Sequence, residues 1–181
     1  MHYSVEEILS TDANRWDRLI SADLSCELKT QLGEKINTIP EVRRFLAAKG
    51  YRDLRHRLEA EIEGFTGEEA VRKMALAFRS FALERPGLAA ATFRNAVTDS
   101  PEWRMEGELL AGLAVTTLQS AGLDHEPARI ALRVLRALVR GFVLHEMSDS
   151  FVDNVDYEAE YSHAVSVFIN GLSALRGPIH H

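Results

Sequence analysis

With 181 residues, the chain has room for one domain, or for one domain with a small appendage. Because 46% of the residues are hydrophobic and 27% are charged, the composition is that of a folded protein and excludes a disordered chain. The net charge of -6 argues against a protein that binds nucleic acid over its whole surface, although a local basic site is compatible with it.

The front of the chain has the pattern of two short helices, over residues 11–24 and 25–36. One face of the first helix carries the apolar residues Trp16, Leu19, Ile20 and Leu24. Joined by a short bend, the two helices form a helix-turn-helix in which the second helix reads DNA. On this interpretation, Lys29, Thr30 and Lys35 contact phosphates or bases. The alternative is a small helical appendage that caps the rest of the molecule.

The middle of the chain continues the helical periodicity. Residues 39–63 follow a helical pattern that we expect to be interrupted near Gly50. Residues 66–69, Thr-Gly-Glu-Glu, have the form of a capping box and predict a helix that runs to about Glu84. Residues 85–87, Arg-Pro-Gly, end this helix, because proline cannot continue it and glycine permits a turn.

From residue 100 onward, the sequence predicts three more helices. Residues 100–102, Ser-Pro-Glu, start a helix that runs to about Ala121, and residues 122–124 break the pattern. Two long amphipathic helices follow, over residues 127–147 and 156–175. The polar stripe of the first consists of Arg129, Arg133, Arg136 and Arg140, and its apolar face of Ala131, Val134, Leu138 and Phe142. The apolar face of the second consists of Tyr157, Tyr161, Ala164, Val165, Phe168, Leu172 and Leu175.

These two apolar faces are too wide for one small domain to bury unaided. A second copy of the chain is the simplest partner, so we predict a homodimer joined by a four-helix bundle. Gly141 and Gly171 each weaken a helix by roughly 1 kcal/mol relative to Ala, which indicates a close helix crossing. The predicted dimer interface consists of Leu138, Gly141, Val165, Phe168 and Leu172.

The predicted fold class is all-α, with a small helical head over residues 1–40 and a helical bundle body over residues 41–176. Cys26 is the only cysteine, so no disulfide forms within the chain, and nothing resembles a secretion signal. No apolar stretch approaches the roughly 18 residues that cross a bilayer. We therefore predict a cytoplasmic protein without a membrane partner.

Several segments of the body carry a family resemblance. Residues 81–88, Phe-Ala-Leu-Glu-Arg-Pro-Gly-Leu, form a helix that ends in a Pro-Gly turn and resemble a motif of TetR-type transcriptional regulators. So do residues 135–143, followed by a short loop and a final amphipathic helix, and residues 47–51, which look like the start of the family's long connecting helix. The resemblance implies an all-helical homodimer with a DNA-binding head and a body that binds a small molecule.

The head departs from the family pattern. Residues 32–40, Leu-Gly-Glu-Lys-Ile-Asn-Thr-Ile-Pro, lack the aromatic residues that the family shows there, and Gly33 weakens the helix. From Met1 to Ala48, six basic residues stand against eight acidic ones. A DNA-binding head should have the opposite balance. The head is therefore interpreted as a diverged or incomplete helix-turn-helix.

The body carries candidate ligand-binding residues. A small apolar effector would fit a cavity between the middle helices, lined by Met74, Phe78, Phe93, Trp103 and Leu110, with Phe142 and His145 as further contacts. His145 lies on the predicted apolar face, so a core or interface histidine is the alternative. The arginine stripe is expected to be a solvated helix face, with phosphate binding as the alternative.

No catalytic residue, metal site or cofactor is predicted. His145-Glu146 begins like a zinc-binding helix, but Asp149 stands where a second histidine is needed. The leading hypothesis is therefore a TetR-like repressor that binds operator DNA and responds to a small molecule. The alternative is a small-molecule binding or heterodimerising protein with the same body and no working DNA-binding head. An enzyme built on the helical body is a third, weaker hypothesis.

Overall fold

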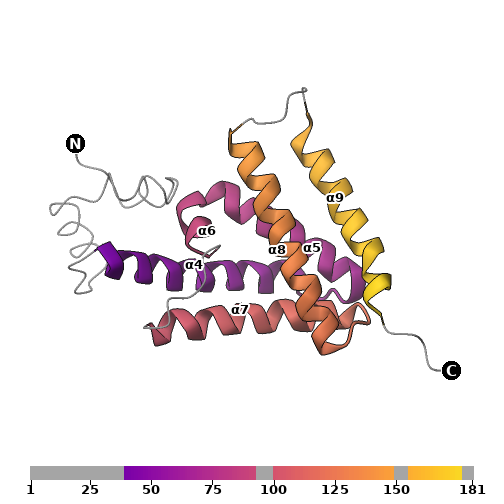
Figure 1. Cartoon of the computed structure of the whole chain (residues 1–181), viewed down its shortest axis with the longest axis horizontal. Helices are drawn as coiled ribbons and strands as arrows, with labels where there is room; N and C mark the ends of the chain where they lie inside the picture. Colours follow the sequence, from indigo (N-terminus) through magenta and orange to yellow (C-terminus); the bar gives the residue numbers. More distant parts are fainter. Residues whose placement is uncertain (1–38, 93–99, 149–154, 177–181) are drawn as a thin grey trace.

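The computed structural model describes residues 39–92, 100–148 and 155–176, and these residues form helices (Figure 1). In chain order the elements are α4 (Ile39–Ile62), α5 (Gly67–Glu84), α6 (Pro86–Thr92), α7 (Pro101–Ser120), α8 (His125–Ser148), α9 (Tyr157–Gly171) and the 3-10 turn η2 (Leu172–Leu175). The predicted all-α fold class is confirmed. The predicted DNA contacts Lys29, Thr30 and Lys35, and the predicted cavity residue Phe93, lie outside the described residues.

Helix α5 is the centre of the bundle, because it contacts α4, α6, α7, α8 and α9. Helices α4 and α7 run side by side, and α8 and α9 form a second pair that crosses them steeply in the view of Figure 1. Large apolar side chains from these helices fill one continuous core, among them Leu54, Leu58, Met74, Leu118, Leu135, Tyr161 and Leu172. None of the described helices is both long and apolar enough to cross a membrane.

Two helices begin with a side-chain cap. Ser100 Oγ accepts a hydrogen bond from the Trp103 amide at 3.4 Å, with Pro101 at the first helical position of α7, as the sequence predicted. Asp156 Oδ1 accepts from the amides of Glu158 and Ala159, at 3.1 and 3.0 Å, at the start of α9. Each cap satisfies backbone donors that a helix leaves without partners in its first turn.

The predicted capping box at the start of α5 does not form. Thr66 makes no side-chain capping bond, and Gly67 adopts a left-handed conformation with φ of 64°. The Gly67 amide donates instead to Ser120 Oγ, at 2.9 Å, at the end of α7. The start of α5 is thus capped by a residue far away in the sequence, which a local pattern cannot reveal.

Gly50 does not interrupt α4, so that prediction is wrong. The helix is continuous from Ile39 to Ile62. A Cβ atom at Gly50 would lie 2.8 Å from the Leu88 carbonyl oxygen, so glycine allows the backbone of α6 to pack against α4. The break after Glu84 is confirmed, but Pro86 opens the short helix α6 because proline is tolerated at a first helical position.

The apolar face of α8 differs from the prediction, whereas the predicted apolar face of α9 is the face that the structure buries. The stripe that α8 buries consists of Ala128, Ala131, Leu135, Val139 and Val143, and Val134 is exposed. On α9, the predicted interface residues Val165, Phe168 and Leu172 are buried in the core of a single chain. The large apolar side chains that these two helices leave exposed are Ile130, Val134, Leu144, Met147 and Val167.

Tyr161 fixes α9 on α5 and α8. Its side chain is fully buried, its hydroxyl donates to the Ala75 carbonyl at 2.8 Å, and its ring meets the edge of Phe142 at 5.4 Å between centroids. Arg79 lies over the same ring and binds both carboxylate oxygens of Glu146, at 2.9 and 2.6 Å. Burial raises the pKa of Tyr161 well above its usual range, although Arg79 opposes the shift, so the phenol stays protonated.

Candidate ligand site and the α4–α7 contact

A small apolar cavity of about 40 Å³ lies among α4, α5, α7 and α8. Its walls include Leu58 of α4, Met74 and Phe78 of α5, Leu110 of α7 and Leu135 of α8. In this form the cavity is much smaller than the 300 Å³ or more typical of ligand pockets. A ligand larger than a few atoms therefore requires the surrounding side chains to move.

Three of the predicted cavity residues meet at this site, namely Met74, Phe78 and Leu110. The other described candidates lie elsewhere. Trp103 is buried but does not line the cavity, and Phe142 packs against Tyr161. His145 is exposed in the single chain, so it is not a core residue, and its predicted place at an interface stays a prediction. The actual buried stripe of α8 is rotated away from it.

Tyr51, Thr92 and Arg136 were missed by the sequence interpretation, and they form the polar part of the cavity wall. The Thr92 carbonyl accepts hydrogen bonds from the Tyr51 hydroxyl at 2.9 Å and from Arg136 Nη2 at 3.1 Å. Tyr51 lies at a helical spacing from Leu54 and Leu58, and this spacing could have indicated that Tyr51 faces the interior with them. The carbonyl of Thr92 is a backbone group, so no residue type marks it in the sequence.

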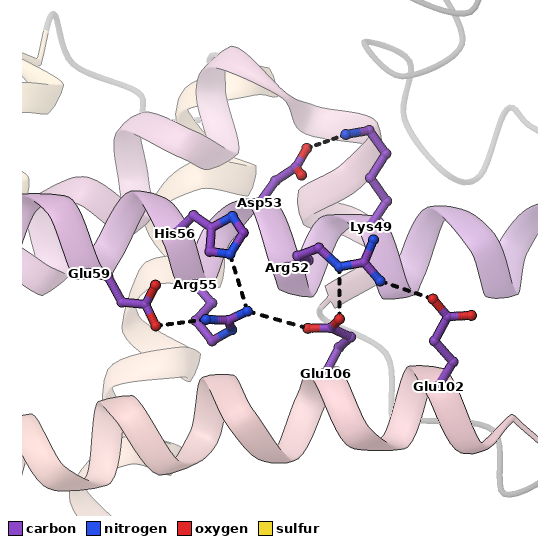
Figure 2. A network of polar contacts seen from close by, with 8 residues as sticks. All are labelled: Lys49, Arg52, Asp53, Arg55, His56, Glu59, Glu102 and Glu106. Atoms are coloured by element: carbon purple, nitrogen blue, oxygen red, sulfur yellow. Dashed lines mark hydrogen bonds and ion pairs between the residues drawn. The ribbon is translucent and has the colours of Figure 1, made fainter. Parts of the chain in front are cut away.

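A polar contact joins α4 to α7 beside the cavity (Figure 2). Arg52 Nε donates to Glu106 Oε1 at 2.8 Å, and Arg52 Nη2 donates to Glu102 at 3.0 Å. Arg55 lies 3.9 Å from the second oxygen of Glu106, which is buried and accepts no hydrogen bond. The hydrogen bond that Arg52 donates to Glu106 raises the pKa of Arg52 above its usual value, and the bond to Glu102 adds to this effect.

The polar contact adjoins the cavity directly. Tyr51 and Gly107 line the cavity, and the residues next to them in sequence, Arg52 and Glu106, form an ion pair in which only Glu106 is buried. A Cβ atom at Gly107 would lie 3.7 Å from the Tyr51 ring, so α4 and α7 approach closely at this point.

The described residues hold no group of three His, Cys, Asp or Glu side chains that could bind a metal ion. The predicted lack of a metal site, a cofactor and catalytic residues stays a prediction. The site offers an apolar cavity, the hydroxyl of Tyr51 and the guanidinium of Arg136. These groups can bind a small molecule by burial and hydrogen bonding.

Comparisons with known proteins agree with this architecture. Residues 71–168 match the family described as "Tetracyclin repressor-like, C-terminal domain". An uncharacterized HTH-type transcriptional regulator of Mycobacterium tuberculosis is 30% identical over 158 residues, which cover 85% of this chain and 72% of the relative. A second one, from Bacillus subtilis, is 24% identical over 137 residues, covering 76% and 71%. The structure of a protein of unknown function from Rhodococcus sp. RHA1 shares the fold, with a TM-score of 0.70, 18% identity, and coverage of 94% and 95%.

Proposed function

The chain belongs to the TetR family of transcriptional regulators, and on this premise we propose that it is a repressor whose binding to operator DNA is controlled by a small molecule. The observation that carries the proposal is the place of the cavity against α4. Tyr51 and Leu58 of α4 line the cavity, and the helix begins at Ile39, directly after the front segment that we propose as the DNA-binding head. A ligand that shifts α4 would therefore change the position of the head.

The proposed repressor is a homodimer. On α8, the exposed residues Ile130, Val134 and Leu144 share one stripe with Gly141, at spacings of four, seven and three residues that suit a helix–helix seam. Both α8 and α9 contact α5 with their buried faces, so their exposed faces lie on the side away from α5. Val167 of α9 is 72% exposed on that side.

The proposed seam keeps Leu138 and Gly141 from the sequence prediction. It replaces Val165, Phe168 and Leu172, which are buried in one chain, with Val134, Leu144 and Val167. A Cβ atom at Gly141 or Gly171 would meet no other atom within 4 Å in the single chain, so a partner helix has room to approach. The open space at both glycines supports a helix crossing between two copies of the chain, and not a helix crossing within one copy.

The experiment that tests the proposal is a DNA-binding titration of the full chain. Fluorescence anisotropy at low salt, with labelled duplexes from the region upstream of its own gene, should find a site bound at least 1,000-fold more tightly than unrelated DNA. The affinity should fall steeply as salt is raised, because phosphate contacts release counterions. Uniform weak binding to all duplexes would contradict the proposal.

One observation favours a second candidate function, a binding protein without a working head. The front of the chain carries more acidic than basic residues, with eight against six from Met1 to Ala48. Such a protein would sequester a small apolar molecule or pair with an intact relative. Failure to bind any duplex, together with formation of a mixed dimer with a full-length TetR regulator, would favour this function over the first.

The family points to a regulator instead of an enzyme, and we propose no catalytic activity. A protein that binds operator DNA acts in the compartment that holds the DNA. A cytoplasmic location is therefore part of the same proposal.

A further inference from the structure

The small cavity shares part of its lining with an open groove. This groove of about 460 Å³ runs along α7 and α8, and Ala111, Leu132 and Arg136 line both the groove and the cavity. The groove and the cavity are therefore neighbours that share these three residues. A ligand that occupied both would contact the Arg136 side chain.

The two hollows differ in chemistry. The cavity is walled mainly by hydrocarbon side chains such as Leu58, Met74 and Leu110. The groove is basic, with Arg129, Arg133 and Arg136 on α8 and one acidic residue, Glu108, on α7. A molecule that fits both has an apolar part and an anionic part.

Arg136 is the arginine placed to bind the anion. Unlike Arg129, Arg133 and Arg140, which are exposed, Arg136 is half-buried. The hydrogen-bond partner found for its guanidinium is the Thr92 carbonyl, and no carboxylate of the described residues lies within ion-pair distance of it. The sequence placed this residue in a solvated stripe, but its position on the shared wall leaves most of its five N–H donors available to a ligand.

We infer that the effector is an amphipathic carboxylate whose apolar end enters the cavity and whose carboxylate binds the Arg136 guanidinium, with Arg133 adding longer-range attraction. The inference rests on the proposed function, because it names the chemical class of the molecule that the cavity binds. A planar carboxylate matches the fork of a guanidinium and forms two charge-assisted hydrogen bonds with it. The cavity admits the end of a hydrocarbon chain, and the flexible Met74 side chain can move to admit more.

Titration calorimetry of the full chain with octanoate, octanol and octylamine tests this inference. Octanoate should bind roughly tenfold or more tightly than octanol, and octylamine should bind most weakly. Among saturated carboxylates, affinity should rise about fourfold for each added CH₂ until the cavity is full. Equal affinity for octanoate and octanol, or no binding of octanoate, would overturn the inference.

Variants locate the anionic subsite. R136Q should abolish the preference for octanoate while leaving octanol affinity unchanged, and R136K should fall between, because lysine keeps the charge but loses the fork. R140Q is the matched control, since Arg140 lies one turn further along α8 and lines neither hollow. Undiminished octanoate binding by R136Q, or an equal loss in R140Q, would overturn the inference.

Two further measurements distinguish a failure of this inference from a failure of the proposed function. If R136Q unfolds, R133Q replaces it, with an expected loss of about two- to threefold in octanoate affinity that high salt removes. The DNA titration is performed on the same preparation. A chain that binds operator DNA but shows no preference for octanoate overturns this inference alone, and a chain that prefers octanoate but binds no operator overturns the proposed repressor alone.

Discussion

Two helix contacts in this molecule differ in how their ion pairs are arranged. Where α5 meets α8 and α9, the contact is mainly apolar around the buried Tyr161, and Arg79 binds both oxygens of Glu146 at its side. Where α4 meets α7, the ion pairs of Arg52 and Arg55 with Glu106 supplement the apolar packing, and one oxygen of Glu106 accepts no hydrogen bond. Interlocked apolar side chains resist displacement. Glu106 lies between two arginines, so its ion pair can be remade with the second one, whereas both oxygens of Glu146 are bound by Arg79 alone. We therefore expect α4 to move against α7 while α5, α8 and α9 stay fixed.

Phe168→Asp breaks the apolar contact and should have the largest effect. Phe168 is 8% exposed, and a carboxylate placed there has no partner, so the variant should lose about 4 kcal/mol or more of unfolding free energy. Circular dichroism in a urea titration measures this loss. Val167→Asp is the matched control, since the adjacent side chain is exposed and the fold should survive. Equal urea midpoints for the two variants would contradict the assignment of the two faces.

Glu106→Gln breaks the polar contact, and the expected loss is about 2 kcal/mol of unfolding free energy. Arg52 and Arg55 would keep their positions without the buried carboxylate between them. Urea unfolding measures the change. Glu102→Gln is the control, because Glu102 binds the same arginine from an exposed position and should lose less than about 0.5 kcal/mol. Equal losses of unfolding free energy in Glu106→Gln and Glu102→Gln would contradict this prediction, because burial of Glu106 would then make no difference.

Tyr161→Phe removes one polar bond from the mainly apolar contact of α9 with α5. Loss of the hydrogen bond to Ala75 should lower the unfolding free energy by about 1 kcal/mol at neutral pH. Burial raises the pKa of the folded phenol, so its contribution is complete below the usual value near 10 and declines as pH rises above it. The phenol of the unfolded chain ionises first, which favours unfolding.

Urea midpoints of the wild type and Tyr161→Phe, measured from about pH 7 to about pH 11, test this prediction. The advantage of the wild type should be constant up to about pH 9 and should shrink at about pH 11. An advantage that persists unchanged at the highest pH would mean that Tyr161 is not held in its neutral form by burial.

The sequence predicted the helices well because their signals are local. Proline and serine mark the start of α7, glycine at position 122 marks the following break, and the period of 3.6 residues runs through α8 and α9. The sequence-based prediction was wrong where the local structure depends on a residue that is distant in the sequence. Gly50 is explained by the backbone of α6, and the start of α5 is capped by Ser120 of α7.

The faces of α8 could not be assigned from the sequence, because this helix is apolar around more than half of its circumference. Val134 and Leu135 are both apolar, yet the first is exposed and the second is buried. The cavity was predicted in part, through Met74, Phe78 and Leu110. Arg136 was missed because its neighbours in the same stripe are solvated, and only the position of Thr92 distinguishes it.

We propose that the exposed apolar face of α8 and α9 joins two copies of the chain. Sedimentation equilibrium of the wild type and Val167→Asp tests this dimer. We expect a dimeric wild type and a monomeric variant with unchanged helical circular dichroism, because Val167 lies in the proposed seam and outside the core of the single chain. A monomeric wild type, or a Val167→Asp variant that remains as dimeric as the wild type, would contradict it.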